Sequence, residues 1–426
     1  MKMRKITCVL VLCLIAVSNH VWAGEPVLKT ITAGGFERQY KVYVPSGYDA
    51  VSVGEAGLLV CLHGLNRNMD DFFTQYNVTA IADKFNLVVI SPNALSEQET
   101  GVNAMADKLA GYGMSLNLDA VWGAGVSIKF KASSQLILNA VGLSDFELNE
   151  NVDDLTFINT IINNTQNEYS KINSQRVFMF GTSLGSFMTY RYAMKHGDSL
   201  AGLISVAGLM GSNIEAEKAF TKPIPVCDFH STTDEVVPYF GDILHPITTP
   251  INTTITVGFG VSKDIVVSKW VNWNGAVTTP VVTEYDVPGK PSVKKIVYSA
   301  TATGAEVTHY ELTDALHDYY FKKSNGDAID YNEEIIAFIG RNNKDITTGK
   351  AQLQRDEIAF YPNPACDFIH FNTSEGTVSI YEPTGRKVLS EQLSGQDIDV
   401  SVLAKGMYIV RVEAGNKVLT HKLIKE

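Results

Sequence analysis

A pattern typical of a nucleophilic serine occurs at Gly181-Thr182-Ser183-Leu184-Gly185. It follows directly after a short apolar run, residues 176–180, and directly precedes a helical pattern. In a strand–turn–helix of this kind the serine sits on a sharp turn, where flanking glycines avoid steric clashes. The N-terminus of the helix also presents backbone N–H groups to developing negative charge. We therefore predict that Ser183 is a nucleophile, and the alternative is a plain glycine-rich turn.

A nucleophilic serine needs a base and an orienting acid, which in this architecture follow it in the order Asp or Glu, then His. Asp234 comes after an expected strand at residues 224–229, and His317 comes after an expected strand at residues 307–312. We predict that Ser183 attacks, His317 takes and returns its proton, and Asp234 orients the imidazole and stabilises its charged form. The alternative is a surface pair satisfied by solvent.

Other histidines and carboxylates fit these two roles less well. His309 lies within an expected strand, where its ring would point into a layer of the fold, and Asp314 is too close in sequence to His317. The remaining rivals lie in a strand, on a helix or in loops elsewhere: Asp228, His196, Asp242 and His245.

An oxyanion hole needs two N–H donors aimed at the developing alkoxide. One donor is the residue after the nucleophile, Leu184, and the other follows an early central strand. That strand, residues 58–62, leads into His63-Gly64-Leu65, and Gly64 allows the tight bend that makes Leu65 the expected donor. His63 precedes the serine and is interpreted as a packing residue. Since neither H-E-x-x-H nor C-x-x-C occurs, we predict no metal and no cofactor.

The elements that must position these residues indicate an α/β fold with a mostly parallel sheet, because short apolar runs alternate with helical patterns from residue 27 to about 340. Strands are expected at 40–44, 57–62, 87–91, 176–180, 203–206, 224–229, 296–299 and 307–312, and helices at 152–162, 186–196 and 332–341. Two segments, 95–151 and 241–261, fit this rhythm poorly and are interpreted as loop excursions of the kind that form lids or binding loops.

The chain is expected to have four parts. Residues 1–23 have a basic start, an apolar run at residues 8–17 and small or slim residues before Gly24, which is the anatomy of a secretory signal peptide. The alternative is an uncleaved membrane anchor; no other long apolar stretch occurs, so no transmembrane segment is expected. Residues 24–342 form the α/β domain, 343–356 a polar linker, and 357–426 a small all-β sandwich with short strands and turn signals.

Charge and cysteine content narrow the possible partners and the redox chemistry. The chain has 426 residues and a formal net charge of −11, which argues against nucleic acid as its main partner. Loss of the signal peptide leaves Cys61, Cys227 and Cys366, an odd number that cannot fully pair. The first two lie in apolar strand-like runs, so we expect them to be buried free thiols.

Residues 34–341 resemble the secreted esterases of the α/β-hydrolase fold grouped as polyhydroxybutyrate depolymerase-like, feruloyl and acetyl xylan esterases. The resemblance is carried by Gly34–Arg38, Val44–Asp49, Leu62-His63-Gly64, Val152-Asp153-Asp154 with Phe157-Ile158, the nucleophile turn with Met188–Arg191, Asp234–Tyr239, Trp270 and Asn274-Gly275. It implies a serine carboxylic-ester hydrolase that works through an acyl-enzyme. Trp122 in the first excursion and Tyr239 after the acid are our candidates for substrate binding.

Three positions depart from the pattern of this esterase group. Ala276 stands where a cysteine is common, Asp318 follows His317 where serine is usual, and Ser231 replaces a usual glycine. All triad positions are filled, so these departures concern substrate preference rather than hydrolysis. Feruloyl, acetyl and hydroxyalkanoate esters all fit, and a plant cell-wall polysaccharide is one implied carrier of the ester.

Residues 357–426 resemble the C-terminal sorting domain of type IX secretion cargo. The matching pieces are Tyr361–Pro364, Thr384–Val388, Leu403–Tyr408 and Lys422–Lys425. The resemblance implies that the type IX machinery exports the protein across the outer membrane and that it is then released or attached to the cell surface.

Two other functional hypotheses remain at this point. The same triad geometry permits a peptidase or amidase, because the fold alone does not choose the substrate. A non-catalytic glycan-binding protein on an inactive hydrolase scaffold would explain the second β-domain and the loop-rich excursion.

Overall fold

The computed structural model describes residues 24–96, 118–131, 139, 142, 145–149, 151–211, 214–248, 254–258, 260–343, 360–361, 363–371, 376–393, 397–414 and 417–425. The expected signal peptide and nearly all of the expected linker lie outside these residues. The chain divides into two compact units, Met1–Ile346 and Thr347–Glu426, and each is described by itself.

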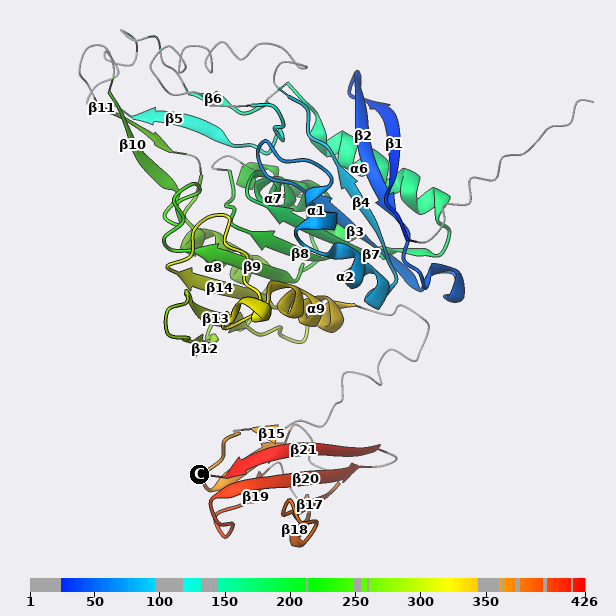
Figure 1. The fold of residues 1–426 in the computed structure, drawn as a ribbon, viewed down its shortest axis with the longest axis vertical. Coiled ribbons are helices and arrows are strands. Elements are labelled where there is room, and N and C mark those ends of the chain that lie inside the picture. The colour runs from blue at the N-terminus through cyan, green and yellow to red at the C-terminus, as the bar shows by residue number, and fades with distance from the viewer. Residues whose placement is uncertain are drawn as a thin grey trace, which may run out of the picture. The chain divides into compact units, whose positions relative to one another are not determined.

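The first unit is built on a ten-stranded sheet in the order β1-β2-β4-β3-β7-β8-β9-β14-β13-β12 (Figure 1). Its strands are β1 (Val27–Ala33), β2 (Phe36–Tyr43), β3 (Ala56–Leu62), β4 (Leu87–Pro92), β7 (Ile172–Thr182), β8 (Leu200–Val206), β9 (Val226–Ser231), β12 (Val281–Tyr285), β13 (Ser292–Tyr298) and β14 (Val307–Thr313). The strands from β4 to β14 pair in parallel, and those at both edges pair antiparallel. The predicted α/β class with a mostly parallel sheet is confirmed.

Hydrophobic composition explains which strands lie at the centre. Every residue of β3 and β4 is buried, since both faces of a parallel sheet are covered by helices and their strands read as continuous apolar runs. The edge strand β12 is largely exposed, and the apolar-run criterion therefore missed it.

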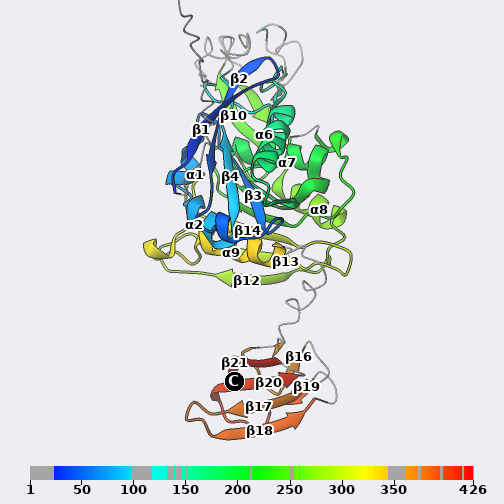
Figure 2. The ribbon, with the colours of Figure 1, turned by 90° about the vertical axis from the view of Figure 1, so that its right-hand side faces the viewer.

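Helices cover both faces of this sheet (Figure 2). The apolar sides of α6 (Asp154–Glu168), α7 (Leu184–His196) and α8 (Lys263–Trp273) pack into one core. Those of α1 (Asp71–Thr74), α2 (Val78–Phe85) and α9 (Tyr331–Asn342) pack into the core of the opposite face. Short 3-10 turns lie at Tyr48–Ala50, Gly197–Ser199, Ile214–Glu217 and Lys323–Asn325.

The two expected loop excursions contain strands that pair with each other, which corrects the interpretation from the sequence. Strands β5 (Ser127–Lys131) and β6 (Phe146–Glu147) come from the first excursion, and β10 (Asp242–Thr248) and β11 (Thr254–Gly258) come from the second. Together they form a four-stranded sheet in the order β10-β11-β5-β6. Local patterning did not indicate this sheet because its central pairing, β11 with β5, joins segments more than a hundred residues apart.

The second unit consists of antiparallel sheets, as predicted. One has the order β15-β16-β19 and the other β18-β17-β20-β21. The strands are β15 (Phe360–Tyr361), β16 (Phe368–Phe371), β17 (Thr377–Tyr381), β18 (Lys387–Gln392), β19 (Asp397–Asp399), β20 (Gly406–Ala414) and β21 (Lys417–Lys425). Alternate residues of both sheets, among them Ile369, Val378 and Val410, form its core.

Two further predictions concern the burial of the cysteines and the absence of a transmembrane helix. Cys61 and Cys227 are buried free thiols, as predicted, and Cys366 is free and exposed. Burial raises the pKa of the Cys61 and Cys227 thiols well above the ordinary value. Within the described ranges, the structure contains no helix with the length and apolar character needed to cross a membrane.

Candidate active site

Ser183 lies on a strained turn between β7 and α7. Its backbone angles, φ 51° and ψ −123°, fall in a region that L-amino acids rarely occupy, and such strain persists only where surrounding structure enforces it. The turn needs Gly185, because a Cβ there would lie 1.9 Å from the carbonyl oxygen of Leu62. This close approach brings the end of β3 against the first turn of α7.

The structure brings Ser183, His317 and Asp234 together in one hydrogen-bonded series. The distance from Ser183 Oγ to His317 Nε2 is 2.9 Å, and His317 Nδ1 lies 2.8 Å from Asp234 Oδ2 and 3.0 Å from Oδ1. Each residue follows a parallel strand, β7, β14 or β9, and the carboxyl ends of parallel strands share one edge of a sheet. This geometry allows proton transfer from Ser183 Oγ to His317 Nε2.

The Asp234 carboxylate is held in its ionised form. Burial alone would raise the pKa of Asp234, but hydrogen bonds from His230 and His317 outweigh burial and hold the pKa well below its usual range. The backbone N–H groups of Val236 and Val237 also donate to Oδ1, at 2.9 and 2.8 Å. An ionised acid can accept the Nδ1–H of His317 and leave Nε2 as the acceptor for the serine proton.

Two residues at this site were missed by sequence reasoning. His230 is fully buried at the end of β9, with Nε2 3.4 Å from Asp234 Oδ2. Glu235 accepts the backbone N–H of His317 at 3.0 Å. A histidine four residues before the acid and a carboxylate directly after it were the available signals.

The expected oxyanion donors border Ser183. A Cβ on Gly64 would lie 3.1 Å from Ser183 Cβ, so the turn that carries Leu65 is in contact with the nucleophile. In the described part of the chain, the N–H groups of Leu65 and Leu184 donate to no protein acceptor.

His63 supports this turn from inside the core. Its Nδ1–H donates to the Gly64 carbonyl at 2.8 Å, and its Nε2 accepts the Ala94 N–H at 3.0 Å. Burial lowers the pKa of His63 to about 4, so the imidazole is neutral. His63 is thus a packing residue, in agreement with the interpretation from sequence.

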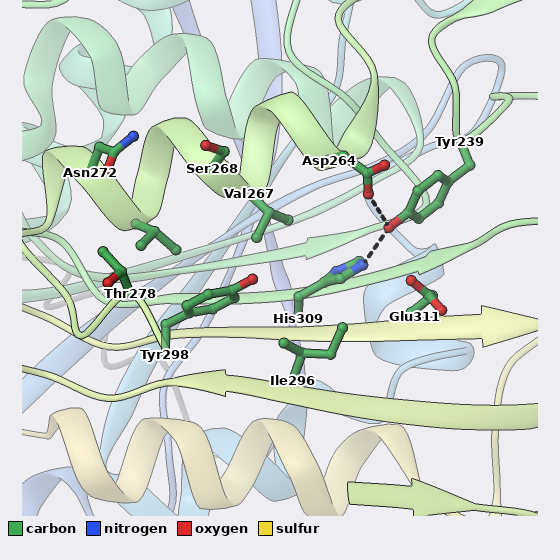
Figure 3. Close-up of a pocket in the computed structure, with 11 residues that line it drawn as sticks. Tyr239, Asp264, Val267, Ser268, Asn272, Thr278, Ile296, Tyr298, His309 and Glu311 are labelled. Carbon is green, nitrogen blue, oxygen red and sulfur yellow. Dashed lines mark hydrogen bonds between the residues drawn. The ribbon is translucent and has the colours of Figure 1, made fainter. Parts of the chain in front are cut away.

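The two candidate substrate-binding residues are both buried. Trp122 is completely buried and donates its indole N–H to the His63 carbonyl at 2.8 Å, so it supports the Leu65 turn instead of offering a surface to substrate. Tyr239 lines a cavity of about 380 Å³, and its hydroxyl lies 3.0 Å from both Asp264 Oδ1 and His309 Nε2 (Figure 3). Burial of aromatic rings depends on tertiary packing, which residue type alone did not reveal.

The described residues include no group of three or more His, Cys, Asp or Glu side chains placed to hold a metal ion.

The histidine that was the alternative to His317 as the base, His309, lies in the sheet, with Nδ1 2.7 Å from Asp228 Oδ2. His309 and Asp228, the alternatives to His317 and Asp234, therefore belong to a buried cluster that does not contact Ser183 Oγ.

Two protein families match separate parts of the chain. Residues 147–254 match the family described as Phospholipase/Carboxylesterase, and residues 359–426 match the Secretion system C-terminal sorting domain. Over 81 residues the chain is 36% identical to NocK of Nocardia uniformis subsp. tsuyamanensis, whose name describes it as an esterase. That match covers 19% of this chain, and the chain spans only 23% of this curated relative.

Solved structures similar to this chain include two esterases. An acetyl xylan esterase from Aspergillus awamori is 14% identical with a TM-score of 0.41, over 74% of this chain and 99% of that one. A ferulic acid esterase from Anaeromyces mucronatus is 14% identical with a TM-score of 0.39, over 79% of this chain and 94% of that one. Likeness at this level does not bear on activity.

The sheet topology thus defines an α/β fold, part of which is similar to the Phospholipase/Carboxylesterase family, and residues 359–426 match a secretion sorting domain. The sorting domain at residues 359–426 marks the chain for type IX secretion, so the protein is extracellular or at the cell surface. The predicted localisation is confirmed.

Proposed function

We propose that this exported protein is a serine carboxylic-ester hydrolase that acts through an acyl-enzyme. The observation that carries the proposal is the hydrogen-bonded series from Ser183 Oγ through His317 to Asp234, at 2.9 and 2.8 Å. The family match over residues 147–254, which include Ser183 and Asp234, supports ester hydrolysis.

The proposed reaction has two stages. In the first, His317 Nε2 takes the Ser183 proton as Oγ attacks the ester carbonyl, and His317 returns that proton to the departing alcohol. In the second, His317 takes a proton from water, which attacks the acyl-enzyme, and then returns the proton to Ser183 Oγ as the acid leaves. Asp234 holds His317 in the required tautomer and stabilises the imidazolium in both stages.

Leu184 and Leu65 serve as the proposed oxyanion donors. Both have N–H groups without a protein acceptor within the described residues, and the Leu65 turn contacts Ser183. Donors fixed before the reaction stabilise the tetrahedral oxyanion without reorganising.

The substrates we propose are feruloyl or acetyl esters on polysaccharides, including those of plant cell walls, and hydroxyalkanoate esters. Export to the cell exterior supports polymeric substrates, since these do not enter the cell. We further propose that residues 24–342 form the catalytic domain, that residues 1–23 are removed as a signal peptide, and that 343–356 link this domain to the sorting domain at 357–426.

A labelling and activity experiment tests the serine mechanism. We expect a fluorophosphonate probe to label the wild-type protein, and Ser183→Ala to lose both labelling and hydrolysis of p-nitrophenyl acetate. Wild-type turnover by Ser183→Ala would refute the proposal, and a complete lack of labelling in the wild type would favour a non-catalytic glycan-binding protein.

A substrate panel tests the class of bond. Matched ester and amide substrates separate an esterase from the peptidase or amidase that the same triad permits. Feruloylated arabinoxylan, acetylated xylan and a hydroxybutyrate oligomer then distinguish the three proposed ester classes.

A further inference from the structure

A buried ion pair lies between the sheet and α8, and the proposed reaction does not use it. Asp228 on β9 and Lys263 at the start of α8 are fully buried, and Lys263 Nζ lies 2.6 Å from Asp228 Oδ1. Removing two charges from water is costly, and a buried ion pair is often no more stabilising than well-packed apolar residues. Its presence therefore calls for an explanation other than stability.

Asp228 is connected to the helix that begins at the nucleophile. Its Oδ1 accepts from Ser205 Oγ at 2.6 Å and from the Tyr190 hydroxyl at 2.9 Å. Ser205 Oγ lies 2.6 Å from Ser186 Oγ. Ser186 and Tyr190 are four residues apart on α7, hence on one face of the helix. Because the Ser186 N–H donates to the Ser183 carbonyl, these contacts hold the turn that presents Oγ.

Lys263 is connected to both the nucleophile turn and the acid. Its ammonium donates to the Gly208 carbonyl at 2.6 Å. A Cβ on Gly208 would lie 2.7 Å from the Ser183 carbonyl, so this backbone packs against the nucleophile turn. His230 lies between this backbone and the acid loop: its Nδ1 is 3.2 Å from the same Gly208 carbonyl, and its Nε2–H donates to the Val237 carbonyl at 2.8 Å.

Contacts with Lys263 and His309 keep the Asp228 carboxylate ionised. His309 Nδ1 lies 2.7 Å from Asp228 Oδ2, and the far nitrogen of this ring faces the Tyr239 hydroxyl (Figure 3). Burial alone would raise the pKa of Asp228, but the Lys263 charge and the His309 hydrogen bond hold it well below the usual range. Asp228 therefore remains ionised and keeps the hydrogen bonds that its two carboxylate oxygens accept.

We propose that the Asp228–Lys263 pair is a positioning device that holds the Ser183 turn and the Asp234 loop at the separation that His317 must bridge. His317 bonds both residues at once, so a relative shift of the turn and the loop lengthens one of its two hydrogen bonds. This inference rests on the proposed function and assigns Asp228 and Lys263 as positioning residues that do not touch substrate.

Three variants separate positioning from simple support of the fold. Asp228→Asn and Lys263→Met each leave a buried charge without its partner, so both should lower the melting temperature. Combining them removes both charges, and the double variant should regain much of the melting temperature. We expect kcat on p-nitrophenyl acetate to fall about 10- to 100-fold in all three, with KM changed less than about threefold. The rate of fluorophosphonate labelling of Ser183 should fall in parallel.

Ile335→Ala is the matched control, since Ile335 is fully buried on α9 in the core of the opposite sheet face. It should lower the melting temperature while kcat stays within about twofold. A double variant with wild-type kcat, or a kcat that follows melting temperature through all variants and the control, would overturn the positioning role. If the single variants do not fold, the double variant decides. Ser183→Ala is assayed in parallel and tests the proposed function separately. If Ser183→Ala turned over substrate at the wild-type rate, the proposed function would be refuted whatever the result for the double variant.

Discussion

The carboxylate of Glu235 accepts the backbone N–H of His317 at 3.0 Å and thereby joins the loop of the proposed acid to the loop of the proposed base. Glu235 follows β9 directly after Asp234, whereas His317 follows β14. The two loops are thus connected twice, once through the imidazole and once through the main chain. The second contact fixes the backbone from which the imidazole extends.

Removing this main-chain contact should reduce activity modestly. One exposed hydrogen bond contributes on the order of 1 kcal/mol, so we expect Glu235→Ala to lower kcat/KM about two- to fivefold. Glu235→Gln keeps an acceptor oxygen at the same position and should retain most of the activity. Steady-state kinetics on p-nitrophenyl acetate measures both, and equal losses in the two variants would contradict the positional role of the bond.

Acid should destabilise the protein partly through Asp234. Its pKa is depressed in the folded state relative to the unfolded chain, where aspartate titrates near about 3.9. Below about pH 5 the Asp234 carboxylate therefore takes up a proton in the unfolded chain but stays ionised in the folded chain. The free energy of unfolding consequently falls as the pH falls. In Asp234→Asn this contribution is absent, so the urea midpoint should depend less steeply on pH between about 5 and 3.

Asp318→Asn is the control for this measurement, because it also removes one carboxylate next to His317 but from an exposed side chain. It should keep the wild-type steepness. An Asp234→Asn protein with an unchanged pH dependence would show that the depressed pKa of Asp234 is not linked to folding.

Leu65→Pro should impair catalysis by removing one proposed oxyanion donor. Proline has no backbone N–H, and loss of one such donor costs about 100- to 1,000-fold in kcat. Leu65→Ala alters the side chain but keeps the N–H, so its kcat should remain within about tenfold of wild type. Circular dichroism checks that both variants are folded, and equal kcat values for folded Pro and Ala variants would exclude Leu65 as a donor.

Thiol labelling should distinguish the three cysteines of residues 24–426. Cys366 is exposed, whereas Cys61 and Cys227 are buried and burial raises the pKa of their thiols well above normal. Because the thiolate is the reactive form, a disulfide reagent should modify Cys366 in the native protein and all three thiols in urea. Cys366→Ser should show no fast labelling, and rapid native reaction of this variant would contradict the burial.

Much of the fold and most of the candidate site followed from local patterns. Strands β3, β4 and β7 were predictable because strands buried on both faces are continuous apolar runs. Ser183 was predictable because a sharp turn beside a helix demands glycines at fixed positions, and Asp234 and His317 because both follow strands of one parallel sheet. The sorting domain was indicated in the same way, by short strands separated by turn residues.

Only the tertiary structure decided which polar residues share a charge environment and which segments pair across long distances. The sequence shows a tryptophan in an excursion and a tyrosine in a loop, but their burial depends on what packs over them, and Trp122 and Tyr239 both lie inside. The pairing of β5 with β11, and of Asp228 with Lys263, joins residues far apart in the chain. Such contacts form only when the whole chain closes, because no short-range pattern records which distant strand or charge will be the neighbour.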